Sequence, residues 1–420
     1  MKKKFMLLTV SAGEGHNSAM KTIRAKLEGE GADVKVVNVF KDHSYGLKYH
    51  IINEGYLMAC KYLMPLFNLG FKMCIGKDPS KRDSVGVHGF LKNETASFLK
   101  DILEFQPDVI FATHIYGAVM ALNLKRTYAL PYKVVFLYTD CIIYPYAECA
   151  VYADKIITPY DALKENYIKL GHTEDQILPY GIPVKEKFYK EDKTTKTEYR
   201  KKLELDENMF TAMLMLGGGG GDDMFRIFKE TIKVTTPIQI IVVCGKDTKT
   251  KNKIDKYLQK HPTHHKIVNY GFVTNVEEIM SASDMLMGKC GGLSSTEAIC
   301  KCLPLMVTTK LPIQEVANYD FMVDNDAILV LGKGEKIADK IEECIKNPDI
   351  LKTIAKNLDA IRNKDILENT YKALDNLGTA EYTEEFDYLK TYKKSQIKKD
   401  VKNMLKAAVK KAKEAKKNNN

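Results

Sequence analysis

Short apolar runs alternate with helix-like segments along most of the chain. In the first part, runs rich in Val, Ile, Leu and Phe occupy residues 5–10, 34–39, 109–113, 134–138 and 156–158. Residues 15–27, which follow the first run, have the pattern of a helix. Alternation of buried strands with helices is typical of a parallel, doubly wound sheet, so the sequence predicts an α/β fold.

The same pattern begins again after Lys185. Apolar runs predict a second set of strands at 212–216, 238–244, 267–270, 285–287, 305–307 and 328–330. Two sets of one pattern predict two Rossmann-like domains, over residues 1–184 and 185–370. The boundary is expected near Gly181-Ile182-Pro183. Beyond the second domain we expect a helical return over 371–389 and a tail over 390–420.

Charge is concentrated in the tail. The 420 residues carry a net charge of +10, and the segment 390–420 alone holds twelve lysines against Asp400 and Glu414. Apolar residues recur there at three- and four-residue steps: Ile397, Val401, Met404, Leu405, Ala408, Ala412 and Ala415. We expect a basic amphipathic helix that docks on an anionic membrane surface. The alternatives are a solvated helix, a disordered end or a nucleic-acid arm, and the neutral body disfavours nucleic acid.

The cysteines and the length of the apolar runs favour a cytoplasmic protein. The nine cysteines form no C-x-x-C pair, which disfavours both a zinc ribbon and a disulfide framework. No stretch reaches the about 20 apolar residues that a membrane-spanning helix needs. Because the first apolar run stops at Ser11, we expect it to be a strand rather than a signal peptide.

Both halves open with a strand, a glycine loop and a helix. Residues 7–10 lead into the loop 11–16, and residues 213–216 lead into the five glycines 217–221. Glycine lets the backbone approach a ligand, and the following helix offers free N–H groups, which suits a diphosphate. Neither loop has the Gly-Lys-Ser/Thr of a P-loop or a complete G-x-G-x-x-G. A plain tight turn from strand to helix is the alternative.

Several short motifs follow one another in an order typical of one enzyme family. The first loop ends in Gly13-Glu14-Gly15-His16, and the second half contains Gly271-Phe272-Val273, the segment from Lys289 to Ala298, and Pro312-Ile313-Gln314-Glu315 followed by Asn318. Over residues 5–370 the chain resembles the monogalactosyldiacylglycerol synthases and the processive diacylglycerol glucosyltransferases. More distantly, it resembles the transferase that adds N-acetylglucosamine to lipid I.

The resemblance implies a GT-B architecture, with two Rossmann-like domains facing a cleft. It also implies an inverting transfer of glucose or galactose from a UDP-sugar to diacylglycerol, giving a β-glycosyl-diacylglycerol. No cofactor and no catalytic metal are expected, and the enzyme would lie peripherally on the cytoplasmic face of the membrane. The alternatives are a UDP-N-acetylglucosamine transferase with a polyprenyl-linked acceptor, and a catalytically idle sensor that binds a UDP-sugar.

The resemblance assigns the UDP-sugar to the second domain. Glu297 would accept both ribose hydroxyls, Phe272 and Val273 would hold uracil through the backbone, and Gln314, Glu315 and Asn318 would bind the hexose. The other expected donor contacts are Gly219, Gly220, Gly221, Gly245, Gly291, Gly292 and Thr296. The alternatives are a carboxylate that caps a helix, a plain strand end and a solvated helix start.

Two side chains of the first domain are candidates for the catalytic base. His16 ends a glycine loop and opens a helix, which lowers the pKa of the imidazole and keeps it neutral. A neutral imidazole can take the proton of an attacking hydroxyl, and an equal alternative is that His16 only orients the acceptor. Asp140 follows the apolar run 134–138 and is the second candidate, with a loop or N-cap carboxylate as the alternative.

The acceptor lipid is expected on the first domain. Tyr56, Tyr62 and Phe67 fall in an apolar region interleaved with lysines, a composition that suits the headgroup level of a membrane. With Gly13 and Gly15 they make up the predicted acceptor site. A helical hairpin packed on the core is the alternative.

Three positions depart from the family pattern. Cys290 stands where the family has proline, and Ile313 stands where it has glycine. The family's tryptophan after the Thr-Asp segment is absent, and Tyr144 or Tyr146 stands nearby. These departures concern the donor sugar and the lipid contacts more than the type of reaction.

Overall fold

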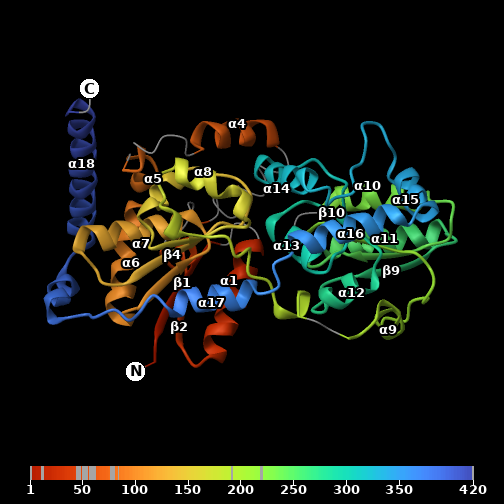
Figure 1. Ribbon diagram of the computed structural model, residues 1–420, viewed down its shortest axis with the longest axis horizontal. Helices are drawn as coiled ribbons and strands as arrows, with labels where there is room; N and C mark the ends of the chain where they lie inside the picture. Colours follow the sequence, from red (N-terminus) through yellow and green to blue (C-terminus); the bar gives the residue numbers. More distant parts are fainter. Residues whose placement is uncertain are drawn as a thin grey trace. The chain divides into compact units, whose positions relative to one another are not determined.

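A computed structural model of the chain describes residues 2–10, 14–43, 49, 55, 63–75, 81–83, 85–190, 193–217 and 221–418. The chain divides into two compact units, of which the first comprises 1–183 with 365–420 and the second comprises 184–364 (Figure 1). The chain therefore enters the second unit after Pro183 and returns to the first unit at Asp365.

The first unit is built on a six-stranded parallel sheet in the order β2-β1-β3-β4-β5-β6. The strands are β1 (Lys4–Thr9), β2 (Asp33–Asn38), β3 (Val109–Ala112), β4 (Lys133–Leu137), β5 (Lys155–Ile157) and β6 (Ile177–Leu178). The five predicted strands of this unit are confirmed to within one residue at each end. The sequence did not indicate β6, because two residues are too few to show a period.

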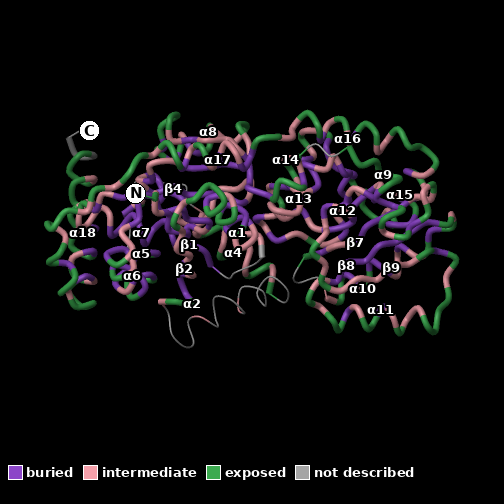
Figure 2. The backbone as a smooth tube through the Cα atoms, turned by 90° about the horizontal axis from the view of Figure 1, so that it is seen from below, coloured by how far each residue is buried: buried purple, intermediate pink, exposed green. Residues whose placement is uncertain are grey.

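Helices cover this sheet and leave its central strands buried. Apart from those of the C-terminal segment, the α-helices among the described residues of the unit are α1 (Glu14–Gly29), α2 (Val39–His43), α4 (Met64–Cys74), α5 (Val85–Phe90), α6 (Lys92–Phe105), α7 (Ile115–Tyr128) and α8 (Lys164–Lys169). Residues 5–9 of β1 and all of β3 are buried (Figure 2). A strand buried on both faces has a continuous apolar run, which is why the sequence located these strands well.

The second unit repeats the design with five parallel strands in the order β11-β10-β7-β8-β9. The strands are β7 (Thr211–Met215), β8 (Gln239–Val243), β9 (Lys266–Tyr270), β10 (Met285–Gly288) and β11 (Leu305–Val307). Its α-helices are α9 (Lys196–Lys202), α10 (Gly221–Thr231), α11 (Thr248–Lys260), α12 (Val276–Ala282), α13 (Gly292–Cys300), α14 (Ile313–Asp324), α15 (Ile337–Lys346) and α16 (Asp349–Ile361).

One predicted strand of the second unit is wrong. Residues 328–330 do not continue the sheet but form a single bridge between Leu329 and Met306. The amide of Leu329 donates to the Leu305 carbonyl over 2.9 Å. Three apolar residues that enter a loop look the same in sequence as a short buried strand, so the pattern alone could not tell them apart.

In each sheet the strand order reverses beside the first strand. β1 lies between β2 and β3, and β7 lies between β8 and β10. At such a point the crossover connections leave in opposite directions and open a crevice at the carboxyl ends of the strands, where α/β sheets bind ligands. The loops after β1 and β3, and those after β7 and β10, are therefore the places to look for a site.

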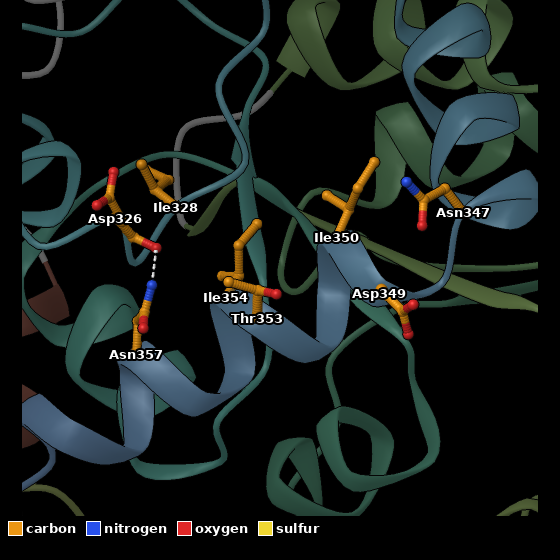
Figure 3. Close-up of a pocket in the computed structure, with 8 residues that line it drawn as sticks. All are labelled: Asp326, Ile328, Asn347, Asp349, Ile350, Thr353, Ile354 and Asn357. Atoms are coloured by element: carbon orange, nitrogen blue, oxygen red, sulfur yellow. Dashed lines mark hydrogen bonds between the residues drawn. The ribbon is translucent and has the colours of Figure 1, made fainter.

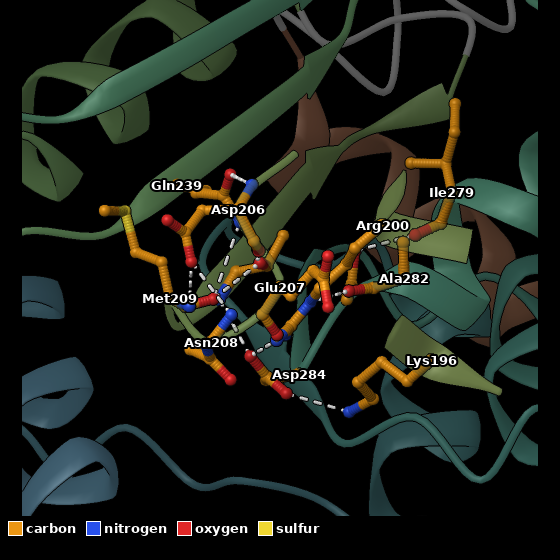
Figure 4. A network of polar contacts seen from close by, with 12 residues as sticks. Lys196, Arg200, Asp206, Glu207, Asn208, Met209, Gln239, Ile279, Ala282 and Asp284 are labelled. Carbon is orange, nitrogen blue, oxygen red and sulfur yellow. Dashed lines mark hydrogen bonds and ion pairs between the residues drawn. The ribbon is translucent and has the colours of Figure 1, made fainter. Parts of the chain in front are cut away.

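The opposite, amino-terminal edge of the second sheet is held by a buried polar network (Figure 4). The guanidinium of Arg200 donates to the Ala282 carbonyl over 3.0 Å and to Asp284 Oδ2 over 2.6 Å. Asp284 Oδ2 also accepts from the amide of Thr211, at the start of β7, over 2.8 Å. Because these contacts join α9 to the beginnings of β7 and β10, they fix the sheet without involving its carboxyl edge.

The C-terminal segment is part of the first unit. It contains α17 (Ile366–Asp375) and α18 (Lys394–Asn418). α17 packs on α1, where Glu368 lies 2.9 Å from the Lys26 ammonium.

The predicted basic helix is confirmed as α18, but its apolar stripe is not free for a membrane along its whole length. Ile397, Val401 and Leu405 are buried in the core of the first unit, where α18 packs on α6 and α7. Tyr128 Oη donates to Asp400 Oδ2 over 3.1 Å. From 406 to 415, where side chains are described, no residue is buried. In this outer part the apolar stripe is therefore not covered by the core of the first unit.

Candidate active site

At the carboxyl edge of the first sheet, His16 points its Nδ1 at a backbone carbonyl. The residue lies in the first turn of α1, and its Nδ1 is 2.5 Å from the carbonyl oxygen of Thr113, directly after β3. A carbonyl only accepts hydrogen bonds, so Nδ1 carries the ring proton and Nε2 keeps its lone pair. The crevice between β1 and β3 thus contains an imidazole in the tautomer that a general base needs.

The surroundings of His16 keep its ring neutral. Burial lowers the pKa of His16 to about 4, and the hydrogen bond to Thr113 opposes this shift only in part. Its neighbour His114, whose ring centroid is 5.0 Å away, also has a pKa far below the usual range, because of burial and of charge on His16. The neutral imidazole expected from the sequence is found, with burial rather than the helix terminus as the largest cause.

The structure connects the two candidate bases. Asp140 follows β4, and its Oδ2 accepts from Tyr144 Oη over 2.6 Å. Tyr144 Oη lies 2.8 Å from Thr139 Oγ1, which in turn lies 3.4 Å from His16 Nδ1. Sequence reasoning gave neither Thr139 nor Tyr144 a role in catalysis, although both lie beside the predicted Asp140. Only the adjacency of β1, β3 and β4 brings these groups together.

An exposed apolar helix adjoins this group of side chains. None of the eleven residues of α4, all of which are described, is buried, and Leu66, Leu69 and Met73 are 64%, 56% and 78% exposed. Its far end is tied to the segment that follows Tyr144. Ile75 pairs with Pro145 in an antiparallel bridge, and the amide of Tyr146 donates to the Cys74 carbonyl over 3.2 Å.

The predicted acceptor residues are described only in part. Gly15 lies in the first turn of α1, next to His16. Phe67 lies on α4, with its ring centroid 6.0 Å from that of Phe71. Gly13, Tyr56 and Tyr62 lie outside the described residues. The packed-hairpin alternative does not hold for α4, which contributes no residue to the core.

In the second unit, two predicted donor segments meet at the ends of β8 and β9. The amide of Gly245 donates to the Gly271 carbonyl over 3.1 Å. Gly245 has a φ of +58°, which an L side chain rarely adopts. Phe272 follows with 68% of its surface exposed, and Val273 is half-buried. The segment expected to hold uracil therefore lies at the carboxyl edge of the sheet, joined by this hydrogen bond to the bend at Gly245.

Glu297 lies further along α13 than the sequence suggested. The helix begins at Gly292, with Gly291 as its N-cap, so Glu297 belongs to the second turn and does not cap the helix N-terminus. Burial raises the pKa of Glu297 to about 8, while the charge of Lys185 opposes the shift and that of Glu277 adds to it. The carboxyl group therefore keeps its proton to a higher pH than an exposed glutamate, and in the protonated form it can both donate and accept a hydrogen bond.

The predicted hexose-binding residues gather around the loop that precedes α13. Asn318 is buried, and its side-chain amide donates to the Cys290 carbonyl over 2.9 Å. A Cβ placed on Gly291 would lie 3.7 Å from Glu315 Oε1. Gln314 is buried at the start of α14. Thr296 Oγ1 donates to the Gly292 carbonyl over 2.8 Å, so this hydroxyl stabilises the helix start.

The glycine loop after β7 lies beside the end of β10. A Cβ on Gly288 would come within 2.7 Å of the Met215 carbonyl oxygen, which is closer than real Cβ atoms approach. Gly217 has a φ of +68°, and Gly221, the first residue of α10, has a φ of +35°. Gly219 and Gly220 lie outside the described residues. The described part of the loop needs glycine for its backbone, as a diphosphate-binding turn would.

A hollow of about 530 Å³ lies elsewhere on the second unit, and Figure 3 shows its lining. It is formed by Asp326, Ile328, Asn347, Asp349, Ile350, Thr353, Ile354 and Asn357. It contains none of the predicted donor-site residues. Across the described ranges, no three His, Cys, Asp or Glu side chains gather as ligands of a metal ion would. Within those ranges no helix has the length and apolar character needed to cross a membrane.

The chain is similar to proteins named as enzymes that glycosylate diacylglycerol. Residues 16–184 match the family model of monogalactosyldiacylglycerol (MGDG) synthase. The chain is 27% identical over 339 residues to a probable MGDG synthase of Glycine max, which covers 77% of this chain and 61% of the relative. It is 24% identical over 359 residues to the processive diacylglycerol beta-glucosyltransferase of Bacillus pumilus, covering 86% and 91% respectively. The chain thus spans about three fifths of the plant relative and nearly all of the bacterial one.

Solved structures show the fold. MurG of Acinetobacter baumannii superposes with a TM-score of 0.57 at 12% identity, covering 89% of this chain and 99% of that one. Anabaena HepE in complex with UDP-glucose gives 0.52 at 15% identity, again covering 89% and 99%. These likenesses show a GT-B architecture, as predicted. Within that class the chain is related to the monogalactosyldiacylglycerol synthases and the processive diacylglycerol glucosyltransferases, which confirms the resemblance seen in its motifs.

Proposed function

We propose that this protein is an inverting glycosyltransferase that transfers glucose or galactose from a UDP-sugar to diacylglycerol, giving a β-glycosyl-diacylglycerol. The observation that carries the proposal is the neutral imidazole of His16. It lies at the reversal of strand order in the first sheet, with its proton on Nδ1 and its Nε2 lone pair available. The names of the relatives, which include a diacylglycerol glucosyltransferase and MGDG synthases, supply the substrate class.

In the proposed reaction, His16 acts on the acceptor hydroxyl. Nε2 takes the hydroxyl proton while the oxygen attacks the anomeric carbon of the sugar, and the bond from that carbon to the UDP oxygen breaks. Attack from the side opposite UDP inverts the configuration. Such a base contributes about 10²–10⁴ in rate. The imidazolium that forms keeps its Nδ1–H bond to the Thr113 carbonyl and later loses the new proton to water.

The second unit would bind the donor. Glu297 would bond the ribose hydroxyls, and Gln314, Glu315 and Asn318 would surround the hexose with hydroxyl-matching groups. Backbone N–H groups at Gly221 and the start of α10 are placed to stabilise the negative charge that develops on UDP, without reorganisation. The solved structure of HepE, which shares the fold, is in complex with UDP-glucose. This supports a UDP-sugar as the donor. No metal ion is required in this scheme.

The acceptor dissolves only in a membrane, so the protein must reach one. The exposed apolar face of α4, tied at Ile75 to the segment after Tyr144, would dip into the headgroup layer and bring lipid to His16. The outer lysines of α18, from Lys406 onward, would add an attraction to anionic lipid of about 1 kcal/mol each near the surface. We therefore place the protein peripherally on an anionic membrane surface.

The test offers UDP-glucose, UDP-galactose and UDP-N-acetylglucosamine in turn to the full chain, with vesicles that contain either diacylglycerol or a polyprenyl-linked acceptor. We expect a hexosyl-diacylglycerol whose anomeric coupling in NMR identifies a β-linkage, and none with His16→Ala. An N-acetylglucosamine product on the polyprenyl lipid would replace this function with the transferase alternative. UDP-sugar binding without transfer to any lipid would favour the sensor.

A further inference from the structure

A continuous row of hydrogen-bonding groups connects His16 to Asp140 at the carboxyl edge of the first sheet. His16 Nδ1 lies 3.4 Å from Thr139 Oγ1, which lies 2.8 Å from Tyr144 Oη. Tyr144 Oη donates to Asp140 Oδ2 over 2.6 Å. Four side chains from the ends of different strands thus form one path, although His16 and Thr139 are 123 residues apart in sequence.

Counting protons gives this row a single direction. A carboxylate only accepts, so the one hydroxyl proton of Tyr144 points at Asp140. The Tyr144 oxygen must then accept the one proton of Thr139. With that proton committed, the Thr139 oxygen faces His16 as an acceptor and shares the Nδ1–H with the Thr113 carbonyl. Every proton in the row points away from His16, and the tautomer with a free Nε2 is the only one consistent with all contacts.

The two middle groups are held in place by packing. Thr139 is buried, with 6% of its surface exposed. The Tyr144 ring is stacked on that of Tyr138, with 5.6 Å between centroids and 6° between planes. Burial and the neighbouring Asp140 hold the pKa of Tyr144 well above its usual range, so the phenol keeps its proton. Among the described residues, the hydrogen bonds of the Thr139 and Tyr144 hydroxyls all lie within the row.

We propose that Thr139 and Tyr144 are positioning residues that couple the His16 imidazole, whose tautomer the Thr113 carbonyl fixes, to the negative charge of Asp140. This inference rests on the proposed function and deepens it. When Nε2 takes the acceptor proton, the ring becomes an imidazolium that still donates through Nδ1. The row stabilises this charge by polarisation, and no proton moves along it. Asp140 then acts at the far end of the row rather than on the acceptor itself.

A double-mutant cycle tests the coupling. Tyr144→Phe and Asp140→Asn should each lower kcat by about tenfold or more with UDP affinity unchanged. The kcat of the double variant should be no lower than that of the slower single variant, because the effects of groups that act as a unit are not additive. Thr139→Val should resemble Tyr144→Phe, and Thr139→Ser, which keeps the hydroxyl, should restore most of the rate. If the Tyr144 and Asp140 effects multiply, Asp140 acts independently and the row has no role.

A matched control separates the row from a general loss of packing. Tyr152 also donates to a carboxylate of the same unit, over 2.8 Å to Asp83 Oδ2, but takes no part in the row. Tyr152→Phe should leave kcat within about twofold of the original. A loss as large as that of Tyr144→Phe would show that the unit tolerates no such change, and would overturn the specific role of Tyr144.

A spectroscopic measurement keeps this inference distinct from the proposed function. Nitrogen-15 NMR of the imidazoles reports which ring nitrogen carries the proton, and a His16→Gln variant assigns the His16 signals. We expect the Nδ1–H form in every variant, because the Thr113 carbonyl remains in place. Titrated by the same signals, the His16 pKa should be lower in Tyr144→Phe and Thr139→Val than in the full chain, but not in Tyr152→Phe, because the imidazolium loses its coupling to Asp140. An unchanged His16 titration in both variants would overturn the inference. The expected shifts in a protein that glycosylates no lipid would instead count against the proposed function alone.

Discussion

Both units begin with a strand, a glycine loop and a helix, and both place that loop where the strand order reverses. The first unit presents at this edge an imidazole, two hydroxyls and a carboxylate in one hydrogen-bonded row. The second unit presents constrained glycine backbone, buried amides and the carboxyl groups of Glu297 and Glu315, of which burial raises the pKa of Glu297 to about 8. In the function proposed above, the same topology would serve proton transfer at one edge and nucleotide recognition at the other, and the side chains that follow each strand would decide which.

The largest effect expected from this contrast is the loss of turnover on removal of the first unit's base. His16→Ala should lower kcat by about 10²–10⁴-fold, the usual contribution of a general base. UDP binding measured by calorimetry should stay near normal, because His16 belongs to the first unit. If Asp140→Asn abolishes turnover while His16→Ala retains it, then Asp140 is the base and the order of the two candidates is reversed.

Removal of the carboxyl group of the second unit should act on binding instead. Glu297→Ala should raise the KM for the UDP-sugar by about 5- to 150-fold, because two hydrogen bonds at about 0.5–1.5 kcal/mol each would be lost. The value of kcat should change little. Glu343→Ala, which removes an exposed carboxylate on α15, is the matched control. Unchanged donor affinity in Glu297→Ala would remove the ribose assignment.

Crowding the second crevice should affect both stability and donor binding. The Cβ of Gly288→Ala would meet the Met215 carbonyl at 2.7 Å, so β10 and β7 must move apart. Overpacking of this kind costs about 1–3 kcal/mol. Thermal unfolding and UDP calorimetry should both show the change. Gly29→Ala, where a Cβ would meet no atom within 4 Å, should not lower stability. Equal melting temperatures for both variants would show that the approach of the two strands is not tight.

The two edges should respond to pH in opposite directions. The pKa of His16 is about 4 in the folded protein and 6.5 in the unfolded chain. The folded protein therefore loses stability as pH falls from 6.5 to 4, because the buried imidazole resists protonation. The pKa of Glu297 is about 8 in the folded protein and 4.5 in the unfolded chain. The folded protein therefore loses stability as pH rises from 4.5 to 8, because the buried carboxyl group resists ionisation. Relative to the original protein, Glu297→Gln should therefore melt higher at pH 9 than at pH 5, and His16→Gln higher at pH 4 than at pH 7. A parallel pH response of both variants would contradict the contrast.

The smallest effects concern membrane contact, which we propose for α4 and α18 of the first unit. A chain that ends at Lys406 keeps the buried Ile397, Val401 and Leu405 but loses the five lysines beyond. It should bind anionic vesicles more weakly at low salt, and the difference should vanish as salt screens the charges over about 8–10 Å. Leu66→Ser with Leu69→Ser on α4 should reduce the salt-resistant remainder. Equal flotation of all forms at every salt concentration would mean that neither helix anchors the protein.

The sequence by itself determined the two α/β units, ten of their eleven strands and the motifs that indicated the family. These features are local. A strand buried on both faces must have a continuous apolar run, and a backbone bend such as that at Gly245 must have glycine, so each leaves its mark within a few residues. A neutral His16 was also predicted from the sequence, from its place at the start of a helix, although the main cause in the structure is burial.

Only the tertiary structure decided what meets at each edge. The order of strands in a sheet leaves no trace in hydrophobic periodicity, so nothing in the sequence placed Thr139 against His16 or Asn318 against the Cys290 carbonyl. The stripe on α18 predicted a helix but not its partner, because an apolar face is equally suited to a membrane and to a protein core until α6 and α7 are in place. Local pattern fixes which residues are buried or bent, whereas the packing of distant segments fixes which of them act together.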